Sequence, residues 1–184
     1  QGKGDAPVNY SLIKWRDIAD GPGIRVSLFV SGCRHHCKGC FNAETWSFTA
    51  GKPYTEAVQE SILKGMEKPY ILGLTLLGGE PFEPENQPHV LALCRKVRER
   101  FPGKTIWCYS GYTLETDMLA GKLGPRDVTM ELLSLLDVLV DGEFHEAEKN
   151  PQLRFRGSGN QRIIDVKETL KTGSTVLWDG GKEP

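Results

Sequence analysis

The sequence predicts an α/β protein with a parallel sheet in the form of an incomplete, TIM-like barrel. Short β-rich runs alternate along the chain with segments of helical periodicity, as they do in βαβ units. Each run also ends in a polar loop that contains glycine, which is typical of strand ends that carry active sites. About five to six βα units fit into this length, too few for a closed eight-stranded barrel, so we expect one side to be open.

The first predicted strand is Ile24 to Val30, a β-rich run that ends directly at a cysteine-rich loop. The turn signal Asp20-Gly21-Pro22-Gly23 precedes it. A helix is expected within Pro53 to Glu67, where apolar residues recur at helical spacing and Thr55 can cap the amino end. Ile71 to Leu77 is a continuous apolar run, as expected of a strand that is buried on both faces.

The second half of the chain continues this alternation of helices and strands. The expected elements are a helix at Asn86 to Phe101, a strand at Thr105 to Tyr109, a short helix at Leu114 to Ala120, a helix at Arg126 to Leu136, and strands at Asp137 to Val140 and Gln152 to Arg156. The tail from Ile163 onward is expected to add a strand and a helical turn.

The composition is that of an ordinary globular protein, with 39% hydrophobic and 26% charged residues. A net charge of −1 gives no reason to expect nucleic acid or an anionic membrane as a partner. No apolar run approaches the roughly 20 residues that span a bilayer, and the polar start is unlike a signal peptide. We therefore expect a cytoplasmic protein with a flexible leader at residues 1–9 and a single domain at residues 10–184.

Three of the five cysteines, Cys33, Cys37 and Cys40, form a C-x3-C-x2-C cluster directly after the first strand. This spacing indicates metal binding rather than a disulfide framework. Three thiolates can hold three irons of a four-iron, four-sulfur cube and leave the fourth iron open to an outside ligand. The spacing also permits a zinc site, for which the candidates for a fourth ligand are His35, His36, Cys94 and Cys108.

The loop after the second strand is a candidate ligand site. In Gly78-Gly79-Glu80-Pro81, the glycines would let a ligand approach the backbone and leave amide N–H and C=O groups free to bind it. Such an edge could recognise the ammonium group of an amino-acid-like ligand, although an ordinary tight turn is the favoured interpretation of the two glycines taken alone. Glu80 is a weaker candidate, with a solvated charge or an arginine partner as its alternatives. Phe41 could stack on a heterocycle or shield a cluster from water.

Taken together, these motifs resemble the radical S-adenosylmethionine (SAM) enzymes, and more closely the activating enzymes of anaerobic (class III) ribonucleoside-triphosphate reductases. The likeness extends over roughly residues 10 to 165. The motifs that carry it are Asp20-Gly-Pro-Gly-Ile-Arg25, Leu28-Phe-Val-Ser-Gly-Cys33, Cys37-Lys-Gly-Cys-Phe-Asn42, Thr45-Trp46, Ile106-Trp107, Ser110-Gly-Tyr112, Leu139-Val-Asp-Gly142, and Arg156-Gly-Ser158 with Asn160-Gln161.

The resemblance implies a [4Fe-4S] cluster on Cys33, Cys37 and Cys40, with SAM chelating the open iron. Reduction of the cluster by one electron would cleave SAM to methionine and a 5′-deoxyadenosyl radical, which would take a hydrogen atom from a glycine of the reductase. No catalytic acid, base or nucleophile is expected, because the cofactor supplies the radical. Gly39, Cys40, Phe41, Gly79 and Ser110 match SAM-contacting positions, and Gly78 and Glu80 complete the candidate set.

The implied partners are the reductase subunit that carries the glycine and a flavodoxin-like electron donor, with neither nucleic acid nor a membrane. Three alternatives stay open. The chain could activate another glycyl-radical enzyme of the formate-lyase type, although such activating enzymes tend to be longer. It could act on a small molecule, as the deazaguanine-forming enzymes do. It could also be a zinc-stabilised, non-catalytic module that binds a larger protein.

Overall fold

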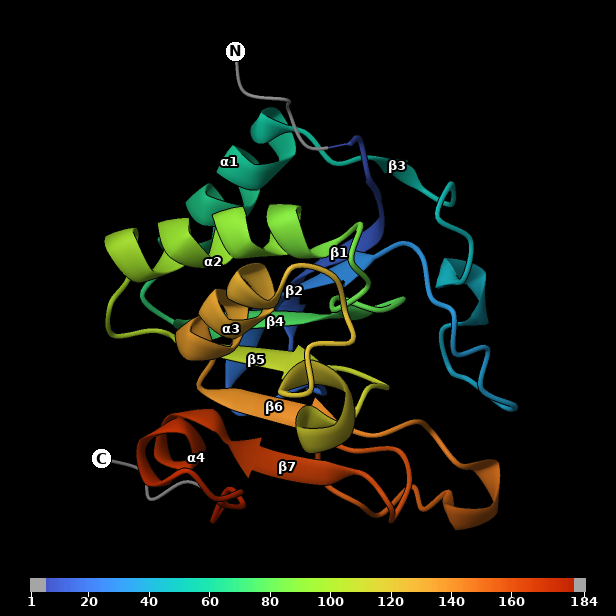
Figure 1. Cartoon of the computed structure of the whole chain (residues 1–184). Helices are drawn as coiled ribbons and strands as arrows, with labels where there is room; N and C mark the ends of the chain where they lie inside the picture. The colour runs from blue at the N-terminus through green and yellow to red at the C-terminus, as the bar shows by residue number, and fades with distance from the viewer. Residues whose placement is uncertain (1–5, 181–184) are drawn as a thin grey trace.

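The computed structural model describes residues 6–180 of the 184 and has a mixed α/β fold. Its elements, in chain order, are β1 (Asn9–Asp17), β2 (Ile24–Val30), η1 (Ala43–Thr45), β3 (Lys52–Pro53), α1 (Glu56–Met66), β4 (Ile71–Gly78), α2 (Gln87–Arg100), β5 (Thr105–Tyr109), η2 (Leu114–Met118), α3 (Arg126–Leu135), β6 (Val138–Asp141), η3 (Glu146–Glu148), β7 (Arg162–Asp165) and α4 (Val166–Thr172). The strands form one sheet in the order β3-β1-β2-β4-β5-β6-β7 (Figure 1).

The four central strands β2, β4, β5 and β6 are parallel, as the sequence predicts. The flanking strands are antiparallel: β1 pairs with β2, and β7 pairs with β6. The sheet is therefore mixed and mostly parallel rather than wholly parallel. The sequence did not predict β1, because this strand is half exposed and mixes polar with apolar residues; Leu12 and Trp15 are 47% and 45% exposed.

The strand predicted at Gln152 to Arg156 is wrong, since the chain turns there and the last strand of the sheet is β7. The segment alternates polar and apolar residues like a strand, but Phe155 has a φ of 61°, which interrupts an extended backbone. The short helix predicted at Leu114 to Ala120 is reduced to the single turn η2.

The helices α1, α2 and α3 cover one face of the sheet (Figure 1). As predicted, Thr55 caps α1, where its side chain accepts a hydrogen bond from the amide of Val58. The helix buries Ile62, Leu63 and Met66 against the sheet. The core therefore lies between the three helices and the central strands.

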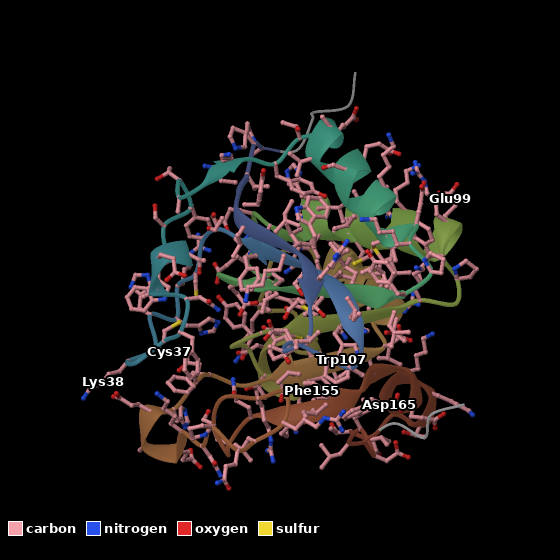
Figure 2. The ribbon with its side chains drawn as sticks, turned by 180° about the vertical axis from the view of Figure 1, so that it is seen from behind. Cys37, Lys38, Glu99, Trp107, Phe155 and Asp165 are labelled. Carbon is pink, nitrogen blue, oxygen red and sulfur yellow. The ribbon has the colours of Figure 1, made fainter. Side chains whose placement is uncertain are left out.

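The opposite face of the sheet carries a second, aromatic cluster, seen from behind in Figure 2 around Trp107 and Phe155. The ring of Trp107 lies 5.3 Å from that of Phe155 and 5.0 Å from that of Trp178. The tail brings Trp178 there by running back along β7, where the amide of Trp178 donates to the carbonyl of Ile163. Cys37 and Lys38 lie at one end of the molecule, and Glu99 at the other.

Part of the segment predicted as a leader is tied to the fold. The carbonyl of Val8 accepts a hydrogen bond from the amide of Tyr54 at 2.8 Å, and Asn9 begins β1. Residues 1–5 lie outside the described residues. In residues 6–180, no helix has the length and apolar character needed to cross a membrane.

Candidate cluster and cofactor site

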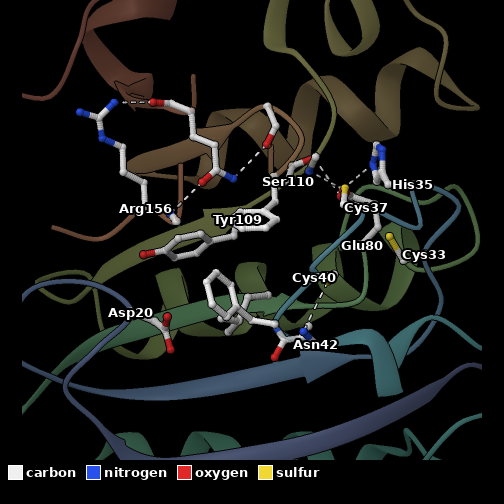
Figure 3. Close-up of a pocket in the computed structure, with 18 of the residues that line it drawn as sticks. Asp20, Cys33, His35, Cys37, Cys40, Asn42, Glu80, Tyr109, Ser110 and Arg156 are labelled. Carbon is white, nitrogen blue, oxygen red and sulfur yellow. Dashed lines mark hydrogen bonds and ion pairs between the residues drawn. The ribbon is translucent and has the colours of Figure 1, made fainter. Parts of the chain in front are cut away.

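The candidate site lies where the carboxyl ends of β2, β4 and β5 meet. Because these strands are parallel, the loops that follow them emerge at the same edge of the sheet. The loops surround a cavity of about 750 Å³ (Figure 3). Most of the residues predicted for the site line this cavity: Cys33, Cys37, Cys40, Phe41, Gly78, Gly79, Glu80 and Ser110. Gly39 does not line it; this glycine turns the chain between two cysteines with a φ of 75°.

Backbone hydrogen bonds hold the cysteine loop in place. The amide of Gly32 donates to the carbonyl of Thr45 at 2.8 Å, and the amide of Cys33 donates to the carbonyl of Trp46 at 3.0 Å. A tight turn brings the amide of Cys40 to the carbonyl of Cys37 at 3.1 Å. The loop is therefore anchored at its start and turns within itself at its end, which fixes where the thiols can point.

Each of the three cysteine sulfurs accepts hydrogen bonds from the backbone. The donors are the amides of His35 and His36 for Cys33, of Phe144 for Cys37, and of Asn42 for Cys40, the last at 3.4 Å. Hydrogen bonds to sulfur are one of the means by which proteins tune iron–sulfur clusters. Burial raises the pKa of the Cys33 thiol to about 12, so a thiolate there needs a cationic partner such as iron. The three side chains fit a cluster that they share.

The candidates for a fourth zinc ligand are engaged elsewhere. Cys94 and Cys108 are fully buried in the core between helices and sheet. His36 stacks on Trp46 with the ring centroids 4.5 Å apart. Among residues 6–180, no three His, Cys, Asp or Glu side chains gather closely enough to hold a single metal ion. A four-iron cube spreads its sulfur ligands more widely than one ion does.

The carboxylate of Glu80 connects three of the loops around the cavity. It is buried and accepts four hydrogen bonds: from the amide of Phe82 at 2.8 Å, the hydroxyl of Ser110 at 2.9 Å, the amide of Gly111 at 2.7 Å and the imidazole of His35 at 3.1 Å. Glu80 is thus neither solvated nor paired with an arginine, the alternatives that its sequence context left open. Its bonds hold the cysteine loop against the loop after β5.

The two glycines before Glu80 permit close contact between backbones. The amide of Gly79 donates to the carbonyl of Val30 at 2.9 Å, and the amide of Glu80 donates to the carbonyl of Gly32 at 2.7 Å. A Cβ atom on Gly79 would lie only 2.6 Å from the Gly32 oxygen. The expectation of free amide N–H groups at this turn is therefore wrong, since the neighbouring loop uses them.

His35, which the sequence suggested only as a possible fourth zinc ligand, instead joins two carboxylates at the site. Its side chain is only 8% exposed and bonds through Nδ1 to Glu143 at 2.8 Å and through Nε2 to Glu80. Burial alone would lower the pKa of His35, but the hydrogen bonds with the two carboxylates outweigh it and raise the pKa to about 9. A protonated His35 thus links the cysteine loop to both partners. Nothing in the sequence pairs it with a residue 108 positions away.

The loop between β6 and β7 forms the outer wall of the cavity. The ring of Phe144 lies 5.0 Å from that of Phe41, and the ammonium group of Lys149 lies 5.1 Å from the same ring. Phe41 is still 60% exposed. The cysteine loop is therefore held between the ends of β4 and β5 on one side and this wall on the other.

The comparisons with known proteins agree with this geometry. The family described as "4Fe-4S single cluster domain" matches residues 19–164, a stretch that includes Cys33, Cys37 and Cys40. The chain is 40% identical to the anaerobic ribonucleoside-triphosphate reductase-activating protein of Escherichia coli (strain K12). The match extends over 162 residues, which are 87% of this chain and 100% of the relative.

Two further relatives carry the same name. The protein of Vibrio cholerae serotype O1 is 42% identical over 159 residues, covering 85% of this chain and 97% of its own. That of Enterobacteria phage T4 is 38% identical over 157 residues, covering 85% and 93%. The chain therefore belongs to the family of anaerobic ribonucleoside-triphosphate reductase-activating proteins, and it contains the 4Fe-4S single cluster domain.

Proposed function

We propose that this chain is a radical SAM enzyme that generates a glycyl radical on an anaerobic ribonucleoside-triphosphate reductase. The observation that carries the proposal is the cavity in which the three cysteines lie beside the turn after β4 and the end of β5. The names of relatives that align over most of this chain indicate the reductase as the target.

Cys33, Cys37 and Cys40 would hold the [4Fe-4S] cluster, because all three line the cavity and accept hydrogen bonds from backbone amides. When bound and reduced, the cluster and SAM supply a carbon-centred radical that takes a hydrogen atom directly. The protein itself then has to bind SAM, exclude water and position the glycine. A catalytic acid or base is not part of this role.

The residues proposed to contact SAM act in different ways. The ammonium group of SAM needs hydrogen-bond acceptors, and the carbonyl groups of Gly78 and Gly79 can provide them. The amide of Gly79 is not needed for this, and it already donates to the carbonyl of Val30. The exposed ring of Phe41 offers a flat apolar face to the adenine. Glu80 and Ser110 line the cavity and shape it by fixing the loops. Gly39 permits the turn that brings Cys40 toward Cys37.

We also propose that the sheet forms an incomplete, TIM-like barrel with one open side. The helices α1 to α3 cover one face of the sheet (Figure 1), whereas Tyr109 and Phe155, from the aromatic cluster on the other face, line the cavity. An open side would admit a loop of a large protein, whereas an enclosed site for a small molecule would exclude it. We propose a flavodoxin-like protein as the electron donor.

The proposal can be tested with cluster-loaded, reduced protein, SAM and an anaerobic ribonucleoside-triphosphate reductase. Electron paramagnetic resonance (EPR) should then detect a glycyl radical on the reductase. Cys37→Ala should abolish the signal, whereas Cys94→Ala, which alters a buried core cysteine, should retain it. SAM cleavage without any glycyl radical would refute the assigned target. Zinc without acid-labile sulfide in anaerobically purified protein would refute the cluster.

A further inference from the structure

Trp46 lies against the cysteine loop through both its backbone and its ring. Its carbonyl accepts a hydrogen bond from the amide of Cys33 at 3.0 Å. Its ring lies nearly parallel to that of His36, with 7° between the planes and 4.5 Å between the centroids. His36 stands between Cys33 and Cys37 in the chain, so the indole packs on the segment that joins two of the proposed cluster ligands.

The indole N–H of Trp46 is a buried hydrogen-bond donor without an acceptor among residues 6–180. Native proteins rarely leave such a group unpaired, because a buried donor that has lost its bonds to water destabilises the fold. An exception calls for a ligand, an ion or a functional role. Because the nitrogen atom of Trp46 is closed to solvent, its acceptor has to be a group that packs directly against the indole.

The cavity shows which acceptors can reach this part of the wall. Trp46 lines it together with Cys33, Cys37 and Cys40. The sulfur of a thiol is only a weak acceptor, whereas iron-bound thiolates and sulfides carry negative charge and accept stronger hydrogen bonds. A cluster on the three cysteines would therefore supply the acceptors that the chain itself does not offer to the indole.

The stacked ring of His36 adds to the same contact. His36 has a φ of 50°, which is uncommon for a residue with a side chain, and its amide donates to the sulfur of Cys33. The indole of Trp46 covers one face of the His36 ring and so supports this conformation. Trp46 thus contacts the cluster loop at the residue whose backbone already binds a cysteine sulfur.

A donor at this position has a defined effect on electron transfer. Each electron that enters an iron–sulfur cluster makes the cluster and its thiolates more negative. An N–H group that points at one of the sulfurs therefore stabilises the reduced form more than the oxidised form, which raises the reduction potential. The proposed chemistry begins with such a reduction, so this donor would make the cluster easier to reduce.

We propose that the indole N–H of Trp46 donates a hydrogen bond to a sulfur of the [4Fe-4S] cluster and thereby raises its reduction potential. The inference rests on the proposed function and deepens it, since it concerns the cluster on Cys33, Cys37 and Cys40. It assigns Trp46 a role in electron uptake that is separate from the binding of SAM.

The first test is an EPR-monitored redox titration of cluster-loaded protein without SAM. In Trp46→Phe, the ratio of reduced to oxidised cluster at a fixed potential should fall about tenfold, which shifts the midpoint about 59 mV to more negative values. The matched control is Trp15→Phe, because Trp15 is half exposed on β1 and does not line the cavity. Its midpoint should equal that of the wild type.

A second variant separates the hydrogen bond from the packing of the ring. Benzothienylalanine at position 46 keeps both fused rings and replaces only the N–H group by sulfur. It should shift the midpoint as Trp46→Phe does, while the Kd for SAM changes less than about twofold in both variants. A wild-type midpoint in the benzothienylalanine protein would overturn the inference.

Electron–nuclear double resonance (ENDOR) of the reduced cluster tests the contact directly, and its decisive sample is the wild type. With ¹⁵N in the indole of every tryptophan, we expect a ¹⁵N coupling that persists in Trp15→Phe and disappears in Trp46→Phe. A reduced wild-type cluster without any ¹⁵N coupling would overturn the inference. A coupling that appears only after SAM is added would overturn it too, because the indole would then serve SAM.

These results are distinguishable from a failure of the proposed function. If the wild type binds the cluster and forms the glycyl radical but shows neither the coupling nor the shift, the inference about Trp46 is overturned and the proposed function stands. If anaerobically purified wild type holds zinc without sulfide, the proposed function fails and the inference fails with it.

Discussion

Replacement of Glu80 by Gln would remove a charge from the centre of the loops that surround the cavity. In the wild type, Oε1 accepts from His35 and from the amide of Gly111, and Oε2 accepts from the amide of Phe82 and the hydroxyl of Ser110. Gln has the same shape but only one accepting oxygen, since its NH₂ group is a donor. In either orientation of the amide, a fixed backbone N–H therefore faces another donor.

The expected cost follows from these contacts. A hydrogen bond to a charged group contributes about 1.5–3 kcal/mol, and a buried donor left without an acceptor costs about 1–3 kcal/mol. The hydroxyl of Ser110 can rotate to find another acceptor. The loss of one backbone hydrogen bond, together with weaker bonds at the other donors, should therefore lower the free energy of unfolding of Glu80→Gln by about 2–4 kcal/mol. For a chain of this size, each kcal/mol lowers the Tm by about 2–4 °C, so the Tm should fall by about 4–16 °C.

Differential scanning calorimetry of the wild type, Glu80→Gln and Glu131→Gln would measure this effect. Glu131 is an exposed carboxylate on α3 that pairs with Arg95, so its replacement removes the same charge without opening a buried network. We expect a clear loss of Tm for Glu80→Gln and almost none for Glu131→Gln. Equal Tm values for the wild type and Glu80→Gln would refute the role assigned to the carboxylate.

The remaining predictions concern the glycine turn, the cysteines and the pH dependence of stability. Gly79→Ala should lower the Tm even without SAM, because its Cβ would press on the Gly32 oxygen, and an unchanged Tm would contradict the packing argument. Cys33→Ala should lose the iron–sulfur absorbance that Cys94→Ala retains, and equal iron and sulfide contents would contradict the ligand assignment. The pKa of Asp20 is raised from 3.8 to about 7, so the folded state binds this proton more tightly than the unfolded state does. Its contribution to stability is therefore present at low pH and is lost as the pH rises toward about 7. In urea unfolding at pH 5 and pH 8, Asp20→Asn should gain stability relative to the wild type at the higher pH, and a constant difference would contradict the shift.

The central part of the fold was predictable from the sequence, because burial on both faces leaves a strong signal. The continuous apolar run at β4 and the helical periodicity of α1 lead to elements within a residue or so of those observed. The edge strands gave no such signal. β1 is half exposed, and the alternation that suggested a strand at 152–156 belongs to a loop bent by the positive φ of Phe155.

The site was predictable where its residues are close in sequence. The spacing of Cys33, Cys37 and Cys40 predicts that they lie together, and all three line the same cavity. Contacts that depend on the strand register could not be predicted: Glu80 meets Ser110 only because β4 lies beside β5, and His35 meets Glu143 only because the loop after β6 folds back. Nothing in a single sequence shows which strands and loops lie side by side.

We propose above all that the chain transfers a hydrogen atom from a glycine of the reductase to a radical derived from SAM. The most direct measurement uses a reductase whose glycines are deuterated at Cα, mixed with reduced, cluster-loaded protein and unlabelled SAM. Mass spectrometry of the 5′-deoxyadenosine should find one deuterium per molecule, together with a glycyl radical by EPR. Unlabelled 5′-deoxyadenosine beside a full glycyl radical signal would contradict the account.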